Sequence, residues 1–368
     1  MRKCKLCGKH LAANILEVCY NCIKKDFEKA LPYINKAHKV ARSPFNLPSS
    51  IPSEGLPCNF CGNSCRISTI GFCGLTERRD NKIKRIVSKD AGLGVIYEDP
   101  HPTNCVASYW CAGGSDAGYP KYSVLPSPEI GYLNAAIFIA SCSYSCLFCQ
   151  NYEWLDIVSE KRIQYLIFRG EIVEKIKKNR RITCVCWFGG DPCTKPEFVY
   201  RVSKDLRECA ENENRILRIC LETNGNFRWE WLKNIAELSL NSGGGIKFDL
   251  KFPRDSMLNL AICGVSNENS YKNFEKLGRL YDKRLEVPFL RASTLLIPHY
   301  ITVNDIKEIA EFIASIDTTI PYCLLAYYPT YHMRDIGFTS KEFALQCYKA
   351  ARKVGLENVR IGNVHLLK

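Results

Sequence analysis

Long apolar runs and long blocks of one charge are both absent from this sequence. Its best apolar runs, Asn134–Ala140 and Ala292–Pro298, have the length of strands, whereas a membrane-spanning helix needs roughly 18 apolar residues. The basic start at Met1–Cys4 is not followed by the apolar core of a secretory signal. We therefore expect a soluble, cytoplasmic protein without a transmembrane segment.

The composition shows little bias apart from its charge. Hydrophobic residues make up 46% of the 368 residues and charged residues 24%, which argues against disorder, collagen or a coiled-coil rod. The 51 lysines and arginines exceed the 38 aspartates and glutamates, giving a net charge of +13. Such a surface suits nucleic acid, anionic lipid or an acidic protein, but also a merely basic enzyme, and no aromatic-rich RNA-binding signature accompanies it.

Cysteine is the residue in excess. The 21 cysteines are odd in number and stand in tight pairs and triplets, which without an export signal favours metal ligation over a disulfide framework. A first quartet has two Cys-x2-Cys pairs and predicts a zinc site, or a rubredoxin-like iron: Cys4, Cys7, Cys19 and Cys22. A second quartet predicts either another zinc or an auxiliary iron–sulfur cluster: Cys58, Cys61, Cys65 and Cys73.

Other cysteines are harder to assign. Cys105 and Cys111 are either extra ligands or buried thiols, and Cys193 follows a predicted strand end. The cysteines within predicted strands or on a helix face are expected to be core residues: Cys184, Cys186, Cys209 and Cys220.

The chain divides into four parts. We expect a zinc-ribbon or rubredoxin-like module at 1–42, a Pro/Ser-rich linker at 43–57, a cysteine-rich segment with the second metal site at 58–130, and an α/β core at 131–368. In the core, predicted strands at 134–141, 182–188, 216–222, 245–250, 285–296, 322–326 and 359–361 alternate with amphipathic helices. This alternation predicts a parallel sheet, open or closed into a full or partial (β/α) barrel, with chemistry at the carboxyl ends of the strands.

A cysteine triplet follows the first of these strands. Cys142, Cys146 and Cys149 form a Cys-x3-Cys-x2-Cys loop. A structural zinc site closes with four ligands, whereas a 4Fe-4S cluster held by three cysteines leaves one iron open to a ligand. The alternative is a zinc site whose fourth ligand lies elsewhere in the chain.

With this loop the sequence resembles the radical SAM superfamily. The resemblance implies that the open iron binds the amino and carboxylate groups of S-adenosylmethionine (SAM), and that one-electron reduction cleaves SAM to a 5′-deoxyadenosyl radical. It further implies that Phe148 packs near the adenine. Gly189-Gly190-Asp191-Pro192 is similar to the family's Gly-Gly-Glu-Pro motif, which binds the SAM amino group through backbone and carboxylate. Aspartate is one methylene shorter than the family's glutamate. The resemblance therefore implies the backbone contacts to SAM more firmly than a contact from the carboxylate of Asp191.

Two further strand ends are similar to the branch that contains the pyruvate formate-lyase activating enzyme. Glu222-Thr223-Asn224-Gly225 and Asp249-Leu250-Lys251 match its motifs. The likeness implies that Glu222 and Asp249 flank a cation beside the SAM carboxylate and that Lys251 contacts that carboxylate. Arg291 and His332 stand where that branch has a SAM-binding arginine and a late active-site histidine. The segment Cys58–Gly74 resembles radical SAM proteins of the AmmeMemoRadiSam type.

The resemblance implies a radical SAM enzyme with a partial, six-stranded (β/α) barrel. It would need a one-electron donor such as a ferredoxin or flavodoxin and would abstract hydrogen from a substrate, with a protein suggested by the activating enzymes. A basic surface beside a small metal domain leaves an RNA-modifying enzyme open, and lipid or small-molecule substrates also stay open. The alternative of another class is a non-catalytic iron–sulfur electron-transfer or metal-binding protein.

Overall fold

A nine-stranded sheet forms the centre of the computed structural model, which describes all of residues 1–368. Its strand order is β15-β14-β13-β12-β11-β10-β8-β7-β9. The strands are β7 (Ala91–Pro100), β8 (Leu133–Ile139), β9 (Leu166–Phe168), β10 (Ile182–Gly189), β11 (Arg218–Thr223), β12 (Ile246–Asp249), β13 (Leu290–Leu296), β14 (Tyr322–Ala326) and β15 (Val359–Gly362). β8 and β10 to β15 are parallel neighbours, so their carboxyl ends meet at one edge, as predicted.

The sheet differs from the prediction at one end. Its parallel part has the seven strands predicted from the sequence, including β15, one more than the six-stranded barrel that the resemblance implied. β7 runs antiparallel to β8 and to β9, and the prediction missed both β7 and β9. β9 and β15 each have a single neighbour, so the sheet stays open, as a partial barrel requires.

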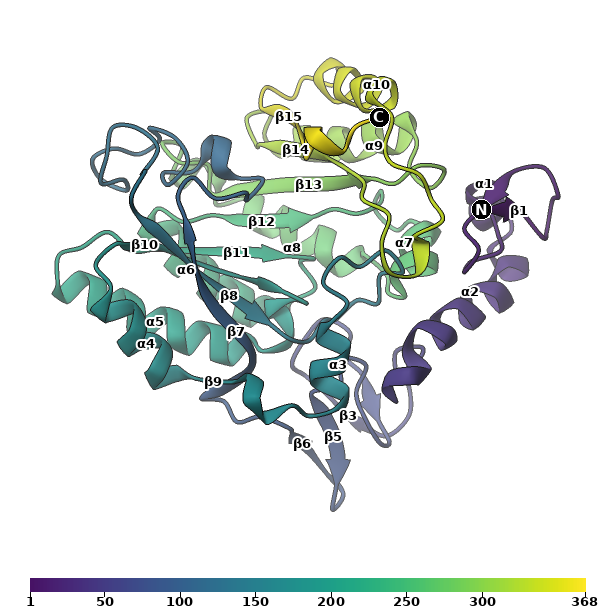
Figure 1. Cartoon of the computed structure of the whole chain (residues 1–368), viewed down its shortest axis with the longest axis horizontal. Helices are drawn as coiled ribbons and strands as arrows, with labels where there is room; N and C mark the ends of the chain where they lie inside the picture. The colour runs from purple at the N-terminus through teal and green to yellow at the C-terminus, as the bar shows by residue number, and fades with distance from the viewer.

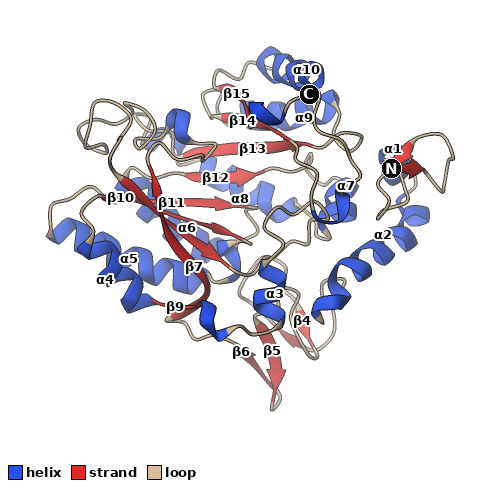
Figure 2. Ribbon diagram, in the orientation of Figure 1, coloured by secondary structure: helices blue, strands red, loops and turns tan.

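Helices between the strands cover the outer face of the sheet (Figures 1 and 2). They are α4 (Arg169–Lys178), α5 (Pro196–Asn212), α6 (Trp229–Ser242), α8 (Glu268–Gly278), α9 (Val303–Ala314) and α10 (Lys341–Lys353). Two short helices, α3 (Trp154–Ser159) and α7 (Met257–Cys263), lie near the carboxyl ends of the strands instead. In α5 the buried side chains recur at helical spacing, including Phe198, Val202 and Leu206. β8 is buried along almost its whole length, as expected for a parallel strand covered on both faces. No helix is both long and apolar enough to cross a membrane.

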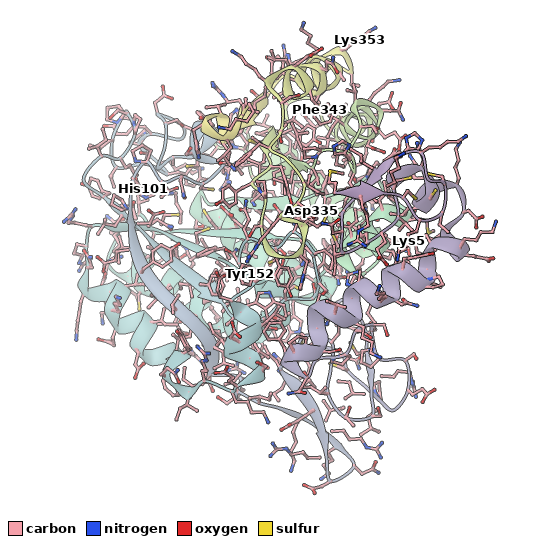
Figure 3. All side chains as sticks on the ribbon, turned by 45° about the vertical axis from the view of Figure 1, so that its right-hand side comes forward. Lys5, His101, Tyr152, Asp335, Phe343 and Lys353 are labelled. Carbon is pink, nitrogen blue, oxygen red and sulfur yellow. The ribbon has the colours of Figure 1, made fainter.

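The amino-terminal segment packs directly on the core. It contains β1 (Arg2–Lys3), β2 (Leu11–Ala12), α1 (Tyr20–Lys25) and α2 (Phe27–Arg42). Asp335, labelled in Figure 3, accepts a hydrogen bond from the backbone N–H of Asn14 (2.8 Å) and pairs with the amino group of Met1 (3.1 Å). The hydroxyl of Tyr300 accepts a hydrogen bond from the backbone N–H of Ala13 at 2.9 Å. One hydrophobic core therefore runs from Cys4 to Val359.

Residues 56–85 form two small two-stranded antiparallel sheets, which lie below the large sheet in Figure 2. They pair β3 (Leu56–Pro57) with β4 (Arg66–Ile67), and β5 (Thr76–Arg79) with β6 (Lys82–Arg85). The expected linker at 43–57 contains one turn of 3-10 helix, Ser43–Phe45, and ends in β3.

A long loop, residues 101–132, closes the amino-terminal edge of the parallel strands. It is held by a buried ion pair in which Arg218 of β11 donates to both carboxylate oxygens of Glu129, at 2.8 and 2.5 Å. Thr183 adds a hydrogen bond to the same carboxylate at 2.6 Å, and both charged side chains are at most 2% exposed. Bidentate pairing and extra donors are what a buried pair needs to offset its desolvation.

The buried His38 of α2 should make the stability of the protein depend on pH. Its Nε2 lies 3.0 Å from the carbonyl of Ala261 in α7, and its burial lowers its pKa to about 4. In the unfolded chain His38 has the ordinary histidine pKa of about 6.5, so it binds a proton at a higher pH there than in the folded chain. The free energy of unfolding should therefore fall as the pH drops from about 6.5 towards 4. We expect a loss of about 2 kcal/mol between pH 7 and pH 5.

Denaturant unfolding at the two pH values tests this expectation. His38→Gln keeps a donor for Ala261 but cannot titrate, so its loss of stability should be smaller than that of the wild type by the same amount. Equal losses in both proteins would show that His38 is not the source.

Candidate active site

One cavity of about 510 Å³ opens among the carboxyl ends of the parallel strands. Of the sequence-predicted SAM and cluster residues, all but His332 line it: Cys142, Cys146, Phe148, Cys149, Gly189, Gly190, Asp191, Glu222, Thr223, Asn224, Asp249, Lys251 and Arg291. The structure thus brings together residues from the carboxyl ends of four strands, β8, β10, β11 and β12, with Arg291 from the start of β13.

The three cysteines of the triplet lie on the loop that follows β8. The thiol of Cys142 accepts hydrogen bonds from the backbone N–H of Tyr144 (3.3 Å) and from Nδ2 of Asn224 (3.6 Å). Burial raises the pKa values of Cys142 and Cys149, whereas a hydrogen bond with Cys263 lowers that of Cys146. Cys263, at the end of α7, is a neighbour of the triplet that the sequence did not reveal.

The triplet supplies three thiolates, one fewer than a closed site. The first quartet, in contrast, brings four ligand atoms within 4.8 Å of one another. Ligands of one ion share its small coordination shell, whereas the thiolates of a four-iron cluster sit on different irons. The donor set of three thiolates with one position left over fits such a cluster.

The glycines after β10 allow this strand end to touch the triplet loop. The backbone N–H of Asp191 donates to the carbonyl of Ser141 (2.6 Å) and that of Gly190 to the carbonyl of Ile139 (2.9 Å). A side chain at Gly190 would collide with the backbone of Ser141, and Gly189 has a φ of +119°. Only glycine fits both positions without strain.

The carboxylate of Asp191 is used within the protein. It accepts hydrogen bonds from the backbone N–H groups of Cys193 (2.9 Å) and Asn224 (2.6 Å) and from the hydroxyl of Thr223 (2.9 Å). Burial raises its pKa, and the side chain is 2% exposed. Asp191 therefore ties the end of β10 to the end of β11, which leaves the backbone of this turn to face a ligand.

Asn224 joins this turn to the triplet loop. Its Nδ2 donates to the hydroxyl of Ser143 (3.1 Å) as well as to the thiol of Cys142. The thiol of Cys193 also donates to Ser143, at 3.2 Å. Donors beside a thiolate ligand stabilise its charge and fix its orientation.

A row of alternating charges crosses the ends of β11 and β12. Lys247 lies between two carboxylates, 3.2 Å from Glu222 and 2.8 Å from Asp249, and Lys251 binds Asp249 from the other side at 3.0 Å. Ser293 of β13 donates to Asp249 at 2.8 Å. Although burial opposes ionisation, the two lysines hold the pKa of Asp249 well below its usual range.

Lys247 was missed by the sequence analysis. Its ammonium group lies between Glu222 and Asp249, where the family resemblance implied a separate cation. The only signal in the sequence is a lysine inside an apolar strand, two residues before Asp249. A lysine there is 7% exposed and requires acidic partners.

Arg291 lies at the amino-terminal side of the cavity, and His332 lies outside it. Arg291 stands at the start of β13, and its Nη2 contacts the carbonyl of Trp110 in the long loop at 3.5 Å. His332 touches the triplet loop only through its backbone N–H, which donates to the carbonyl of Leu147 at 3.1 Å, and its ring packs against Tyr331.

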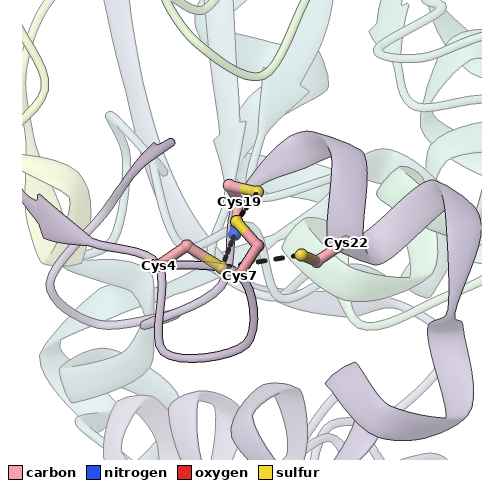
Figure 4. Close-up of side chains that lie close together, drawn as sticks. All are labelled: Cys4, Cys7, Cys19 and Cys22. Atoms are coloured by element: carbon pink, nitrogen blue, oxygen red, sulfur yellow. Dashed lines mark hydrogen bonds between the residues drawn. The ribbon is translucent and has the colours of Figure 1, made fainter. Parts of the chain in front are cut away.

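The first quartet is arranged as a closed metal site (Figure 4). Its four sulfur atoms all lie within 4.8 Å of one another, with Cys4 and Cys22 3.7 Å apart and Cys7 and Cys19 3.8 Å apart. The two pairs come from the β1–β2 segment and from the start of α1. Four thiolates at this spacing fit one tetrahedral ion and leave no open position.

Removing that ion should unfold the module around it. A chelator is expected to lower the hydrogen-exchange protection of residues 1–25, because the ion would join the β1–β2 segment to the start of α1, and its loss leaves four thiols facing one another. The barrel strands should keep their protection and serve as the internal control. Unchanged exchange in residues 1–25 after the metal is shown to be gone would contradict a structural role for the site.

The second quartet is buried behind the triplet loop. Cys58, Cys61, Cys65 and Cys73 are at most 7% exposed, and they do not reach single-ion spacing. The hydroxyl of Ser141 donates to the carbonyl of Cys73 at 2.9 Å, which joins this quartet to the start of the triplet loop.

Buried cations surround this quartet. Arg42 is fully buried and donates to the carbonyls of Pro48 and Phe72, and Lys195 is 3% exposed. Burial lowers the pKa values of Arg42, Lys195 and Arg85, and the charge of Cys73 opposes this shift. Burial also raises the pKa values of Cys58, Cys61 and Cys65, so these thiols need a bound metal to ionise.

Comparisons with known proteins identify the core. Residues 136–313 match the model of the Radical SAM superfamily. One solved structure that matches is a histidine-tagged anSMEcpe with bound AdoMet, at 15% sequence identity and a TM-score of 0.37; the match covers 58% of this chain and 55% of that one. Another is a native anSMEcpe with bound AdoMet and a peptide, at 13% sequence identity and a TM-score of 0.39, and this match covers 60% of each chain. This chain therefore spans less than two thirds of those proteins. No curated protein matches. Residues 136–313, which contain the triplet and the strand-end motifs, are a radical SAM domain.

Proposed function

We propose that this protein is a radical SAM enzyme that cleaves SAM reductively and abstracts a hydrogen atom from a substrate. The observation that carries the proposal is the convergence of the cysteine triplet and three strand-end motifs on one cavity inside a radical SAM domain. When bound, the cluster would supply the electron and SAM the 5′-deoxyadenosyl radical.

The triplet would hold the cluster and leave one iron open. Cys142, Cys146 and Cys149 supply the thiolates, and the donors from Tyr144 and Asn224 stabilise the charge on Cys142. The positive charge of Lys251 also lowers the pKa of Cys146, although Asp249 and burial oppose it. These contacts favour the deprotonated sulfur atoms that iron needs.

The polar end of SAM would lie between the two strand-end turns. The backbone of Gly189 and Gly190 would receive its amino group, and Lys251 its carboxylate, with Glu222, Lys247 and Asp249 fixing the position of that lysine. Thr223 and Asn224 stay in place through Asp191. Phe148, 4% exposed and 5.8 Å from the ammonium of Lys251, would pack against the adenine. The proposal leaves out His332, whose ring does not line the cavity.

The two quartets would serve different purposes. The first would hold zinc as a structural ion, because its spacing is that of one closed tetrahedral site. The second would hold an auxiliary iron–sulfur cluster that passes electrons from a ferredoxin or flavodoxin to the triplet. Its burial and its contact with Ser141, at the start of the triplet loop, support this choice over a second zinc.

The hydrogen donor is proposed to be a protein segment. The resemblance of the strand-end motifs to the activating enzymes supports this choice. Binding of RNA that weakens as salt rises would instead favour an RNA substrate.

Anaerobic reconstitution tests the proposed activity. Protein loaded with iron and sulfide and reduced with dithionite should convert SAM to 5′-deoxyadenosine. Samples without dithionite, or with the iron chelated, should form none. A fully loaded protein that neither cleaves SAM nor binds it in a titration would contradict the proposal.

A further inference from the structure

A second group of cysteines lines the same cavity below the triplet. It consists of Cys105, Cys111, Cys184, Cys186 and Cys220. Cys184 and Cys186 precede Gly189 on β10, and Cys220 precedes Thr223 on β11, so these thiols lie deeper in the barrel than the triplet loop. Cys184, Cys186 and Cys220 were expected to be core residues because they lie in apolar strands, but they line the cavity.

The thiols of this group contact or influence one another. The sulfur atoms of Cys184 and Cys220 are 3.5 Å apart, close to the 3.7 and 3.8 Å between paired thiols of the first quartet. Cys186 of β10 lies opposite Cys220 of β11 in the strand register, and Cys105 donates to Glu222 near the end of β11 at 2.8 Å. The group therefore contains one close pair on neighbouring strands, with Cys186 opposite one member of the pair and Cys105 beside Glu222.

A buried arginine without a matching anion lies next to the group. Arg291 is 4% exposed, its Nε has no hydrogen-bond partner, and its one contact is the 3.5 Å bond from Nη2 to Trp110. An unpaired guanidinium in such a place is costly unless a negative group joins it.

We infer that this part of the cavity is a second iron–sulfur site, with Cys184 and Cys220 on one iron of a two-iron cluster, Cys105 and Cys186 on the other, and Arg291 as the counter-charge. In a two-iron cluster, two thiolates share each iron, which agrees with the 3.5 Å pair. A four-iron cluster would separate all of its thiolates. A single ion does not fit, because no three ligands of the group reach single-ion spacing.

The test compares two double variants of the full chain. After anaerobic reconstitution, Cys184→Ser/Cys220→Ser should hold about two iron and two sulfide fewer per chain than the wild type. The matched control, Cys209→Ser/Cys347→Ser, also replaces one half-buried and one buried thiol, but neither lines the cavity, and its iron content should be unchanged. Iron and sulfide content does not depend on SAM cleavage, so failure here is distinct from failure of the proposed function.

Two outcomes would overturn the inference. One is a folded Cys184→Ser/Cys220→Ser variant with the iron and sulfide of the wild type. The other is a Cys184–Cys220 disulfide in anaerobically prepared, unreduced wild-type protein. If the double variant does not fold, the iron content of Cys105→Ser, a substitution in the long loop, is measured instead. A loss of about two iron atoms per chain supports the site, and the full iron content of the wild type overturns it.

Discussion

Cys146→Ala should lower the formation of 5′-deoxyadenosine by more than about 100-fold. Removing a residue that only hydrogen-bonds to a metal ligand typically lowers activity by up to about 100-fold, and removing a ligand itself should cost more. Cys146 is the middle cysteine of the triplet and a proposed cluster ligand, and its thiol is the one whose pKa is lowered by a neighbouring thiol and by Lys251. Without it, two thiolates remain, which do not hold a four-iron cluster in place. The measurement is 5′-deoxyadenosine released per chain under dithionite.

Cys209→Ala is the matched control for this prediction. Cys209 lies on α5, outside the cavity, and its loss should leave SAM cleavage unchanged. If Cys146→Ala cleaved SAM as fast as Cys209→Ala, the triplet could not be the site of cleavage.

Lys247→Met should weaken SAM binding by about 100-fold. The variant removes the ammonium between Glu222 and Asp249 and leaves two facing carboxylates in a buried site, and breaking a buried ion pair costs about 3 to 5 kcal/mol. Part of that cost appears as lost affinity, because Asp249 then turns Lys251 away from the SAM carboxylate. Equilibrium dialysis with labelled SAM measures the change.

Added potassium distinguishes this explanation from a general loss of structure. A cation that enters between the two carboxylates should restore part of the affinity of Lys247→Met but leave the wild type unchanged. Lys233→Met, which removes an exposed lysine on α6, is the control and should bind SAM normally. Wild-type affinity in Lys247→Met without potassium would rule out the bridging role of Lys247.

The parts of the fold and site that the sequence revealed are those with strong local patterns. The apolar strands alternate with helices whose buried residues recur at regular spacing, and short motifs mark the strand ends. Because parallel strands end at one edge, the strand pattern alone was enough to predict that Cys142, Gly190, Asn224 and Asp249 meet there.

The parts that were missed depend on which way a side chain faces. Cys184, Cys186 and Cys220 sit in apolar strands, and nothing local tells a cavity-facing thiol from a core one. Lys247 gains its role only from Glu222, which is distant in sequence. Strand β7 was missed because its pairing with β8 is a long-range contact.

Asp191 shows a different limit. The motif alone indicated a carboxylate for the SAM amino group, whereas the structure uses it to hold Cys193, Thr223 and Asn224. A shorter side chain reaches neighbouring backbone more readily than a ligand, which fits the departure from glutamate. Whether the carboxylate of Asp191 binds neighbouring backbone or a ligand depends on the adjacent strand β11, so the sequence of β10 alone does not predict it.

Electron–nuclear double resonance on the reduced protein tests the central claim most directly. SAM labelled with 13C in its carboxylate and 15N in its amino group should show magnetic coupling to an iron–sulfur cluster in the wild type and none in Cys146→Ala. The coupling identifies the cluster that binds SAM, whatever other clusters the chain holds, and it needs no substrate. Absence of coupling in wild-type protein with a full complement of iron and sulfide would contradict SAM binding at the open iron of the triplet.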